Sequence, residues 1–281
     1  MKLNDFRTFF NKELENIYPK KEIDAFFFRI IEDEMGLSLL DLFTQKDAII
    51  DPSKLELFNN ILNRLKKEEP IQYILGSTEF YGYKFYVNPN VLIPRPETEE
   101  LISWVKENLT IDKTPKILDI GTGSGCIAIT LKKELPNSDV SAIDISEGAI
   151  KTASNNAENN RAEINFIKHD ILSEKKLEYK YDIIVSNPPY VRNLEKQEIK
   201  NNVLNNEPHL ALFVEDDNPL IFYKRIADVA KYALNPNGIL FFEINQYLGI
   251  ETKEMLIHKG FKNVILKQDL FGNDRMIKAN L

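Results

Sequence analysis

The sequence predicts an α/β protein: a doubly wound, mostly parallel sheet of seven strands, preceded by a smaller helical domain. Two observations support this fold class. From residue 115 onward, short apolar runs alternate with stretches of helical periodicity, as in right-handed βαβ units whose sheet is covered on both faces. Before residue 76, the periodicity is helical. The expected strands are 116–120, 140–145, 164–167, 181–187, 238–244, 264–266 and 276–278.

Helical signals fill residues 1–75. Gly36 predicts a helix stop between two apolar segments, because glycine readily adopts the left-handed conformation that closes a helix. Asp51 is expected to cap the next helix, with Pro52 at its first position. The apolar side chains that then recur at helical spacing are Leu55, Phe58, Ile61, Leu62 and Leu65. We expect a small helical bundle with one of two roles, docking of a substrate or stabilisation of the larger domain.

Residues 76–95 are rich in aromatic side chains and interrupted by glycine and proline, which predicts a β-hairpin. We take this hairpin as the connector to a main domain over residues 96–281. Two prolines fix an extended bend around Arg95, for which a structural role is favoured over contact with a ligand. Thr98 is expected to cap a helix that runs to Asn108.

The remaining helices are expected between the strands of the main domain, because apolar positions there recur at helical spacing. Their ranges are 126–135, 146–159, 218–234 and 247–259. Asparagine pairs such as Asn155-Asn156 indicate a solvent-exposed surface.

Composition excludes several classes of protein. The chain has 281 residues, of which 43% are hydrophobic, so it can bury a sizeable core, and its net charge of −7 argues against stable binding to nucleic acid. The single cysteine, Cys126, excludes an internal disulfide, and the three histidines are too far apart for a metal-binding spacing. The sequence has no apolar run of the ~20 residues that span a bilayer and no signal-peptide core, so we expect a cytoplasmic protein without a membrane partner.

A glycine turn, Gly121-Thr122-Gly123-Ser124-Gly125, joins the first strand of the sheet to the next helix. Such a turn lets the backbone approach a ligand closely. The spacing is G-x-G-x-G with Cys126 in the sixth position, which differs from the dinucleotide fingerprint, and a phosphate-binding G-K-[ST] is absent from the sequence here. The turn therefore predicts a ligand without a pyrophosphate.

Acidic residues end or follow the neighbouring strands. Asp144 ends the second strand, where a carboxylate can accept hydrogen bonds from ribose hydroxyls, and Asp170 follows the third, where it can meet an adenine amino group. Asp119 lies just before the glycine turn and is expected to orient either an ammonium group or the turn itself. A nucleoside with an amino-acid tail fits this set, and S-adenosyl-L-methionine has that structure.

A second motif, Asn187-Pro188-Pro189-Tyr190, follows the apolar strand at 181–185. Two prolines cannot continue a central strand, so the chain turns here at the sheet edge where ligands bind in open α/β folds. The Asn187 amide oxygen and the Pro188 carbonyl offer two hydrogen-bond acceptors, and Tyr190 can cover a flat group. This combination suits the grip of a planar –NH2 group.

The glycine-turn segment 118–125 resembles motif I of class I S-adenosylmethionine-dependent methyltransferases, and the 187–190 motif resembles that of members that methylate planar amino groups. Together with Ile93-Pro94-Arg95-Pro96-Glu97-Thr98-Glu99 and the segment 207–213, the chain is similar to the HemK family of release-factor glutamine N5-methyltransferases.

The resemblance implies a seven-stranded Rossmann-like methyltransferase sheet and methylation of the glutamine in the Gly-Gly-Gln motif of peptide-chain release factors. It implies catalytic roles for Asn187, Pro188 and Tyr190, with Pro189 also in the substrate site. It implies that the glycine turn, Asp144, Asp170, Ile171 and Asn187 hold the cofactor. Ile171 would pack on adenine, where some members have an aromatic residue.

Three alternatives stay open at this point. An adenine-N6 nucleic-acid methyltransferase uses the same Asn-Pro-Pro-Tyr grip, although it must also bind phosphates and a flipped base. A glutamine methyltransferase can act on a ribosomal protein instead. A non-catalytic nucleoside-binding module is the third, and the intact 187–190 motif argues against it.

Overall fold

The computed structural model describes residues 1–45, 47–109, 114–173, 177 and 179–281. It divides into two compact units. The first contains Met1–Gly76 and Asn201–Asn206, and the second contains Ser77–Lys200 and Glu207–Leu281.

The first unit is helical. Its aromatic core includes Phe6 stacked on Phe58 at a centroid distance of 5.5 Å, and Phe10 edge-on to Phe27 at 5.7 Å. The predicted helix stop is confirmed, because Gly36 has a φ of +65° after α2. The elements are α1 (Leu3–Leu14), α2 (Lys20–Met35), α3 (Leu39–Thr44), α4 (Pro52–Leu65), α5 (Ile71–Leu75) and α9 (Asn201–Asn206). The predicted cap of α4 is confirmed as well, since the Asp51 side chain accepts a hydrogen bond from the Ser53 amide.

The second unit begins with the predicted hairpin. Strands β1 (Ser77–Phe80) and β2 (Tyr83–Tyr86) pair antiparallel across a two-residue turn. Both turn residues, Tyr81 and Gly82, have positive φ values of 52° and 76°. This is the left-handed pair that matches the natural twist of hairpin strands.

A seven-stranded sheet follows, in the order β10-β11-β9-β6-β3-β4-β5. The five strands from β9 to β5 are parallel, while β11 runs antiparallel to both of its neighbours. The strands are β3 (Lys116–Ile120), β4 (Asp139–Asp144), β5 (Asn165–Lys168), β6 (Tyr181–Ser186), β9 (Leu234–Glu243), β10 (Lys262–Gln268) and β11 (Asp274–Asn280). The predicted fold class is therefore confirmed.

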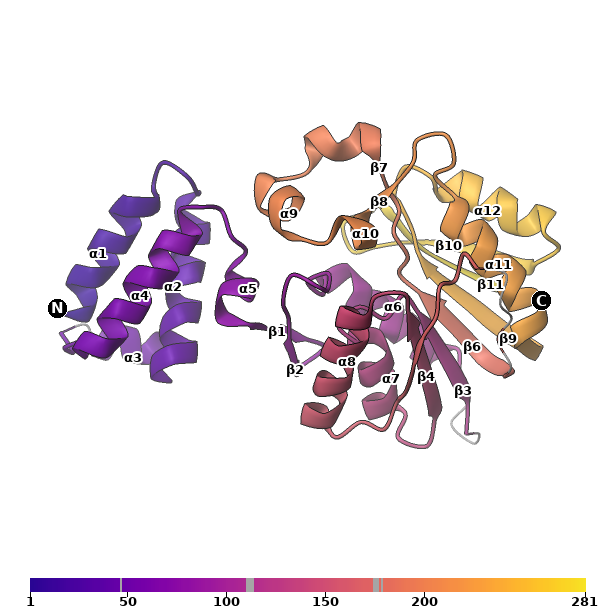
Figure 1. Ribbon diagram of the computed structural model, residues 1–281, viewed down its shortest axis with the longest axis horizontal. Helices are drawn as coiled ribbons and strands as arrows, with labels where there is room; N and C mark the ends of the chain where they lie inside the picture. The colour runs from indigo at the N-terminus through magenta and orange to yellow at the C-terminus, as the bar shows by residue number, and fades with distance from the viewer. Residues whose placement is uncertain (46, 110–113, 174–176, 178) are drawn as a thin grey trace. The chain divides into compact units, whose positions relative to one another are not determined.

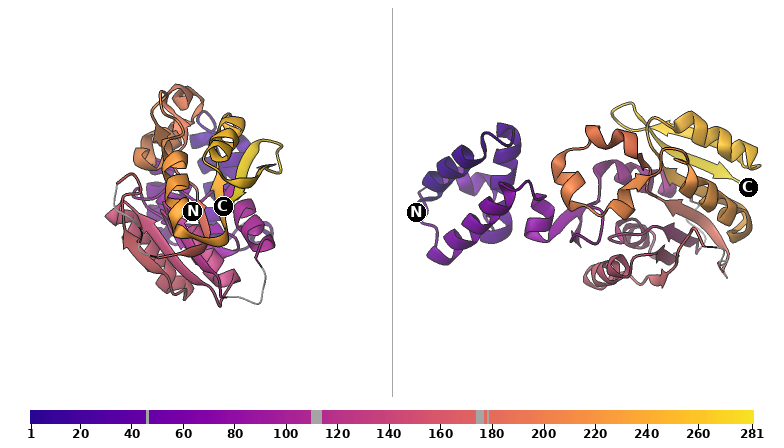
Figure 2. Two further views of the ribbon diagram at one scale, coloured as in Figure 1. Left: turned by 90° about the vertical axis from the view of Figure 1, so that its right-hand side faces the viewer. Right: turned by 45° about the horizontal axis from the view of Figure 1, so that its top comes forward.

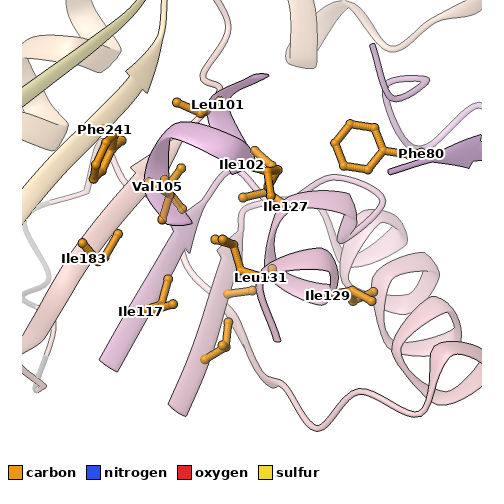
Figure 3. Packing of buried hydrophobic residues seen from close by; sticks show 14 of the residues in the cluster. Phe80, Leu101, Ile102, Val105, Ile117, Ile127, Ile129, Leu131, Ile183 and Phe241 are labelled. Atoms are coloured by element: carbon orange, nitrogen blue, oxygen red, sulfur yellow. The ribbon is translucent and has the colours of Figure 1, made fainter. Parts of the chain in front are cut away.

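Helices cover both faces of this sheet (Figures 1 and 2). Alternate residues of a strand point to opposite faces, so Ile183 packs with one layer and Ile184 with the other. Figure 3 shows the layer in which α6 and α7 pack on β3, β6 and β9. Helices α11 and α12 cover the other face. The helix bounds are α6 (Pro96–Glu107), α7 (Cys126–Glu134), α8 (Glu147–Asn160), α11 (Ile221–Ala233) and α12 (Gly249–His258).

Two sequence predictions about this unit are wrong. Helix α6 begins at Pro96, so Thr98 lies inside its first turn, and the Thr98 hydroxyl donates to Glu243 instead of capping the helix. Proline at the first position explains the earlier start, because its fixed φ suits a helix and it has no N–H to satisfy. Asn156 is completely buried, whereas its sequence neighbourhood predicted surface.

Several short elements follow β6 that the sequence analysis did not predict. They are β7 (Val191–Arg192), the 3₁₀ helix η1 (Asn193–Glu198), α10 (His209–Leu212) and β8 (Phe213–Val214).

Across both units, each helix of the described residues is too short or too polar to cross a lipid bilayer.

Candidate active site

A cavity of about 230 Å³ opens at the carboxyl ends of β3, β4, β5 and β6. The predicted site residues that line it are Gly121, Thr122, Gly123, Ser124, Asp144, Asp170, Ile171, Asn187, Pro188 and Pro189. Tyr190 lines a smaller pocket that shares Asn187 and Pro188 with the larger one. The topology thus brings together residues from four separate strand ends, because parallel strands present their carboxyl ends at one edge.

The glycine turn is held open by backbone geometry and by Asp144. Gly121 and Gly123 have φ values of +77° and +55°, where a side chain would strain the backbone. The Gly123 amide donates to Asp144 Oδ2 at 2.9 Å, and the Ser146 amide donates to Oδ1 at 2.9 Å. Burial raises the pKa of Asp144, against these backbone hydrogen bonds. Each carboxylate oxygen has a second lone pair, so Asp144 can still accept hydrogen bonds from a ligand.

Gly125 is not among the described residues that line the cavity, and its role is in helix packing. It has a φ of +82°, and a Cβ at this position would lie 2.8 Å from Ile129 Cδ1 and 3.1 Å from Ala153 Cβ. The glycine therefore lets α7 and α8 approach each other behind the turn.

Asp119 of β3 holds the glycine turn through a hydrogen bond with Thr122. It is fully buried, and its Oδ2 accepts a hydrogen bond from the Thr122 hydroxyl at 2.6 Å. Burial raises the pKa of Asp119 to about 7, and the hydrogen bond from Thr122 opposes this rise. Of the two roles expected for Asp119, the structure shows the contact with the turn.

The segment after β5 is fixed by hydrogen bonds that involve the Asp170 side chain and Arg225 of α11. Asp170 Oδ1 accepts the Leu172 amide at 2.8 Å, and the Ile171 carbonyl accepts Arg225 Nε at 2.9 Å. Ile171 is half-buried and lines the cavity, together with Phe222 of α11. An apolar wall therefore lies next to a carboxylate, which suits a base carrying an amino group.

A chain of hydrogen bonds anchors Asn187. Asn187 Nδ2 donates to Thr98 Oγ1 at 3.3 Å, Thr98 Oγ1 donates to Glu243 Oε2 at 2.6 Å, and the Tyr190 hydroxyl donates to Glu243 Oε1 at 3.1 Å. Glu243 is 1% exposed, and burial raises its pKa and that of Tyr190. Tyr190 therefore stays protonated as a hydrogen-bond donor. The sequence analysis did not single out Glu243. A carboxylate at the end of an apolar strand, as in β9, is nevertheless a sequence signal of a site residue.

Two further residues hold the walls of the site. Asn156 of α8 accepts the Tyr86 amide and donates to the carbonyls of Tyr86 and Ser124, so it ties the hairpin to the glycine turn. Glu207 accepts hydrogen bonds from the Ile93 amide at 3.1 Å and from Arg95 at 2.6 Å. The predicted structural role of Arg95 agrees with this ion pair, and Arg95 also lines the cavity.

The residues present fit S-adenosylmethionine. The left-handed glycines leave room for close approach of a ligand, and the Ser124 hydroxyl is buried without a hydrogen-bond partner among the described residues. Asp144 at the end of β4 and Asp170 after β5 supply carboxylates, and apolar side chains line the same cavity. A ligand with hydroxyl, amino and flat apolar parts matches this set.

Comparisons with known proteins agree with this geometry. A PrmC N-terminal domain model matches residues 7–76, and a methyltransferase small domain model matches residues 98–212. The release factor glutamine methyltransferase of Flavobacterium psychrophilum is 55% identical, over 100% of this chain and 99% of the relative. The chain belongs to the release factor glutamine methyltransferase family. The family protein of Bacteroides thetaiotaomicron is 46% identical, over 99% of this chain and 100% of the relative.

Among solved structures, the hMettl16 catalytic domain, determined in complex with the MAT2A 3′UTR hairpin 6, has a TM-score of 0.57. The sequence identity is 22%, over 75% of this chain and 80% of that chain, so this similarity concerns the fold. Family membership confirms the predicted enzyme class, a glutamine methyltransferase, and its methyl donor, S-adenosylmethionine.

Proposed function

We propose that this protein transfers a methyl group from S-adenosyl-L-methionine to the side-chain N5 of the glutamine in the Gly-Gly-Gln motif of peptide-chain release factors. The observation that carries the proposal is the anchored Asn187 beside a cavity that fits the methyl donor. The name of the family, to which the chain is related over its whole length, supports the choice of substrate. We place the reaction in the cytoplasm, where translation occurs.

The cofactor site in this proposal consists of the residues that line the cavity. The glycine turn from Gly121 to Ser124 lines the amino-acid end of this site, and Asp144 accepts hydrogen bonds from the ribose. Asp170 and Ile171 hold the base, Ile171 by aliphatic packing. When bound, the cofactor supplies an activated methyl group on a sulfonium centre.

The substrate site consists of Asn187, Pro188, Pro189 and Tyr190. A glutamine amide nitrogen is a weak nucleophile because its lone pair is delocalised into the carbonyl. Asn187 Oδ1 and the Pro188 carbonyl each accept one N–H of the substrate amide, which fixes the nitrogen for transfer. Tyr190 forms the wall of the pocket beside them and limits access of water.

Orientation is the main contribution of these residues. Well-oriented reactants gain roughly 7–11 kcal/mol relative to free encounter. The two hydrogen bonds strengthen as positive charge develops on the nitrogen, so they favour the transition state over the bound substrate. A general base is not required during the transfer, because the methylated amide loses its proton readily afterwards.

The partner in this proposal is the release factor itself, docked by the helical unit. The net charge of −7 is unfavourable for stable nucleic-acid binding, so we expect the protein substrate to provide the contacts.

Transfer of labelled methyl to a purified release factor tests the proposal. We expect label on the factor, and loss of that label when the Gly-Gly-Gln glutamine is replaced by alanine. Asn187→Ala should retain cofactor binding, measured by calorimetry, and lose most turnover. Label on a DNA duplex or on a ribosomal protein, with none on the release factor, would overturn the choice of substrate.

A further inference from the structure

We propose that Thr98 and Glu243 are positioning residues that determine which end of the Asn187 carboxamide faces the substrate. The inference rests on the proposed function, in which Asn187 Oδ1 accepts an N–H of the substrate amide. Neither residue touches the reacting atoms in this proposal. They act through Asn187, from the first turn of α6 and the carboxyl end of β9.

The direction of the hydrogen bonds carries the inference. A carboxylate has no proton to donate, so Glu243 can only accept from the hydroxyls on either side of it. The distance of 2.6 Å from Thr98 Oγ1 to Glu243 Oε2 is typical of a hydroxyl that donates to a carboxylate. A hydroxyl has one proton. Once Thr98 has donated it to Glu243, Thr98 can only accept from Asn187.

Asn187 must therefore present its –NH2 end to Thr98, which is the observed contact at 3.3 Å from Nδ2 to Oγ1. The carboxamide is planar, so its oxygen points the other way. The opposite orientation would leave two acceptors facing each other, which is unfavourable at a site where Thr98 is 2% exposed. An acceptor is the group that a substrate –NH2 requires.

The network also explains the burial of Glu243. Tyr190 donates to its second oxygen at 3.1 Å. Burial raises the pKa of Glu243, while the hydrogen bonds from Thr98 and Tyr190 and the charge of Arg275 favour the ionised carboxylate. With both oxygens occupied by hydroxyl donors, the carboxylate has a single arrangement of partners. This arrangement links Tyr190 and Asn187, the two ends of the substrate motif, through one buried group.

Hydrogen exchange of the Asn187 side chain tests the orientation without substrate or cofactor. The Asn187 amide resonance is identified by its loss in Asn187→Asp. We expect its exchange to be at least about tenfold slower in the wild type and in Thr98→Ser than in Thr98→Val, which keeps the shape but removes the hydroxyl. Equal exchange rates in wild type and Thr98→Val would overturn the inference.

Steady-state kinetics on the release factor test the consequence. We expect Thr98→Val and Glu243→Gln to lower kcat by about 10- to 100-fold, with KM and cofactor affinity within about twofold of the wild type. Thr98→Ser should restore most of the turnover. Ser103→Ala is a matched control, because it removes a hydroxyl of the same helix that donates to the Glu99 carbonyl.

The two proposals fail differently. Absence of methyl transfer by the wild type rejects the release factor as substrate, while the exchange rates still decide the orientation of Asn187. Normal transfer by the wild type with an unchanged kcat in Thr98→Val and Glu243→Gln rejects the positioning role. Glu243→Gln keeps the size of the side chain, so it tests the inference even if Thr98→Val folds poorly.

Discussion

The pKa of Asp119 predicts that this protein loses stability as the pH rises to 8. Burial raises this pKa to about 7, so the folded state binds the proton more tightly than the unfolded state does. Tighter proton binding by the folded state stabilises it. This contribution of Asp119 is fully present below the unfolded pKa of about 3.9 and is lost as the pH rises through the folded pKa of about 7. Between pH 5 and pH 8 the loss is about 2–3 kcal/mol in the free energy of unfolding.

Asp119→Asn removes this dependence, because the carboxamide is neutral at every pH and can still accept from Thr122. Between pH 5 and pH 8, we expect the free energy of unfolding, measured in urea, to fall by about 2–3 kcal/mol less in the variant than in the wild type. The single tryptophan, Trp104, reports on the second unit, since it is 6% exposed and lies edge-on to Phe241 at 5.6 Å.

The matched control is Asp139→Asn, which removes an exposed carboxylate at the start of the neighbouring strand β4. Its stability should follow the pH dependence of the wild type. If wild type and Asp119→Asn lose stability in parallel between pH 5 and pH 8, the burial argument for Asp119 is wrong.

Three further outcomes follow from the packing. Gly125→Ala should lower the free energy of unfolding by about 2–4 kcal/mol, since its φ is +82° and the new Cβ would lie 2.8 Å from Ile129 of α7 and 3.1 Å from Ala153 of α8. Gly260→Ala is the control, because a Cβ there meets no atom within 4 Å and the variant should show only the cost of the positive φ. Burial raises the pKa of Cys126 to about 12, so its alkylation at pH 8 should be over about 100-fold slower in native protein than in concentrated urea. Glu207→Gln should lower the free energy of unfolding by about 1–3 kcal/mol, because it removes the charged partner of Arg95. Urea unfolding followed by the fluorescence of Trp104 measures this, and an unchanged urea midpoint would contradict it.

The strand and helix pattern was predictable because it depends on local periodicity. Strand β3 has the bounds that the apolar run predicts, and α7 and α8 each lie within one residue of prediction at both ends. The exceptions have physical reasons. Strands β7 and β8 have two residues each, too few for an alternation to be recognised, and β9 starts at Leu234 before its apolar run.

The candidate site was predictable where a residue type is tied to a strand end. The glycine turn, Asp144, Asp170 and Asn187 all face one cavity, as parallel topology requires. Gly125 shows the limit of this reasoning, because a glycine in the same turn can serve ligand approach or helix packing. Its neighbours from α7 and α8 decide between the two.

The sequence by itself determined the alternation of strands and helices, the glycine turn and the Asn187 motif, because each depends on residues close together in the chain. Only the tertiary structure decided how these parts are held. Thr98 and Glu243 are 145 residues apart and meet because α6 packs beside the carboxyl end of β9. Hydrogen bonds between such distant residues leave no periodic signal, and their direction depends on burial and on the partners that folding brings together.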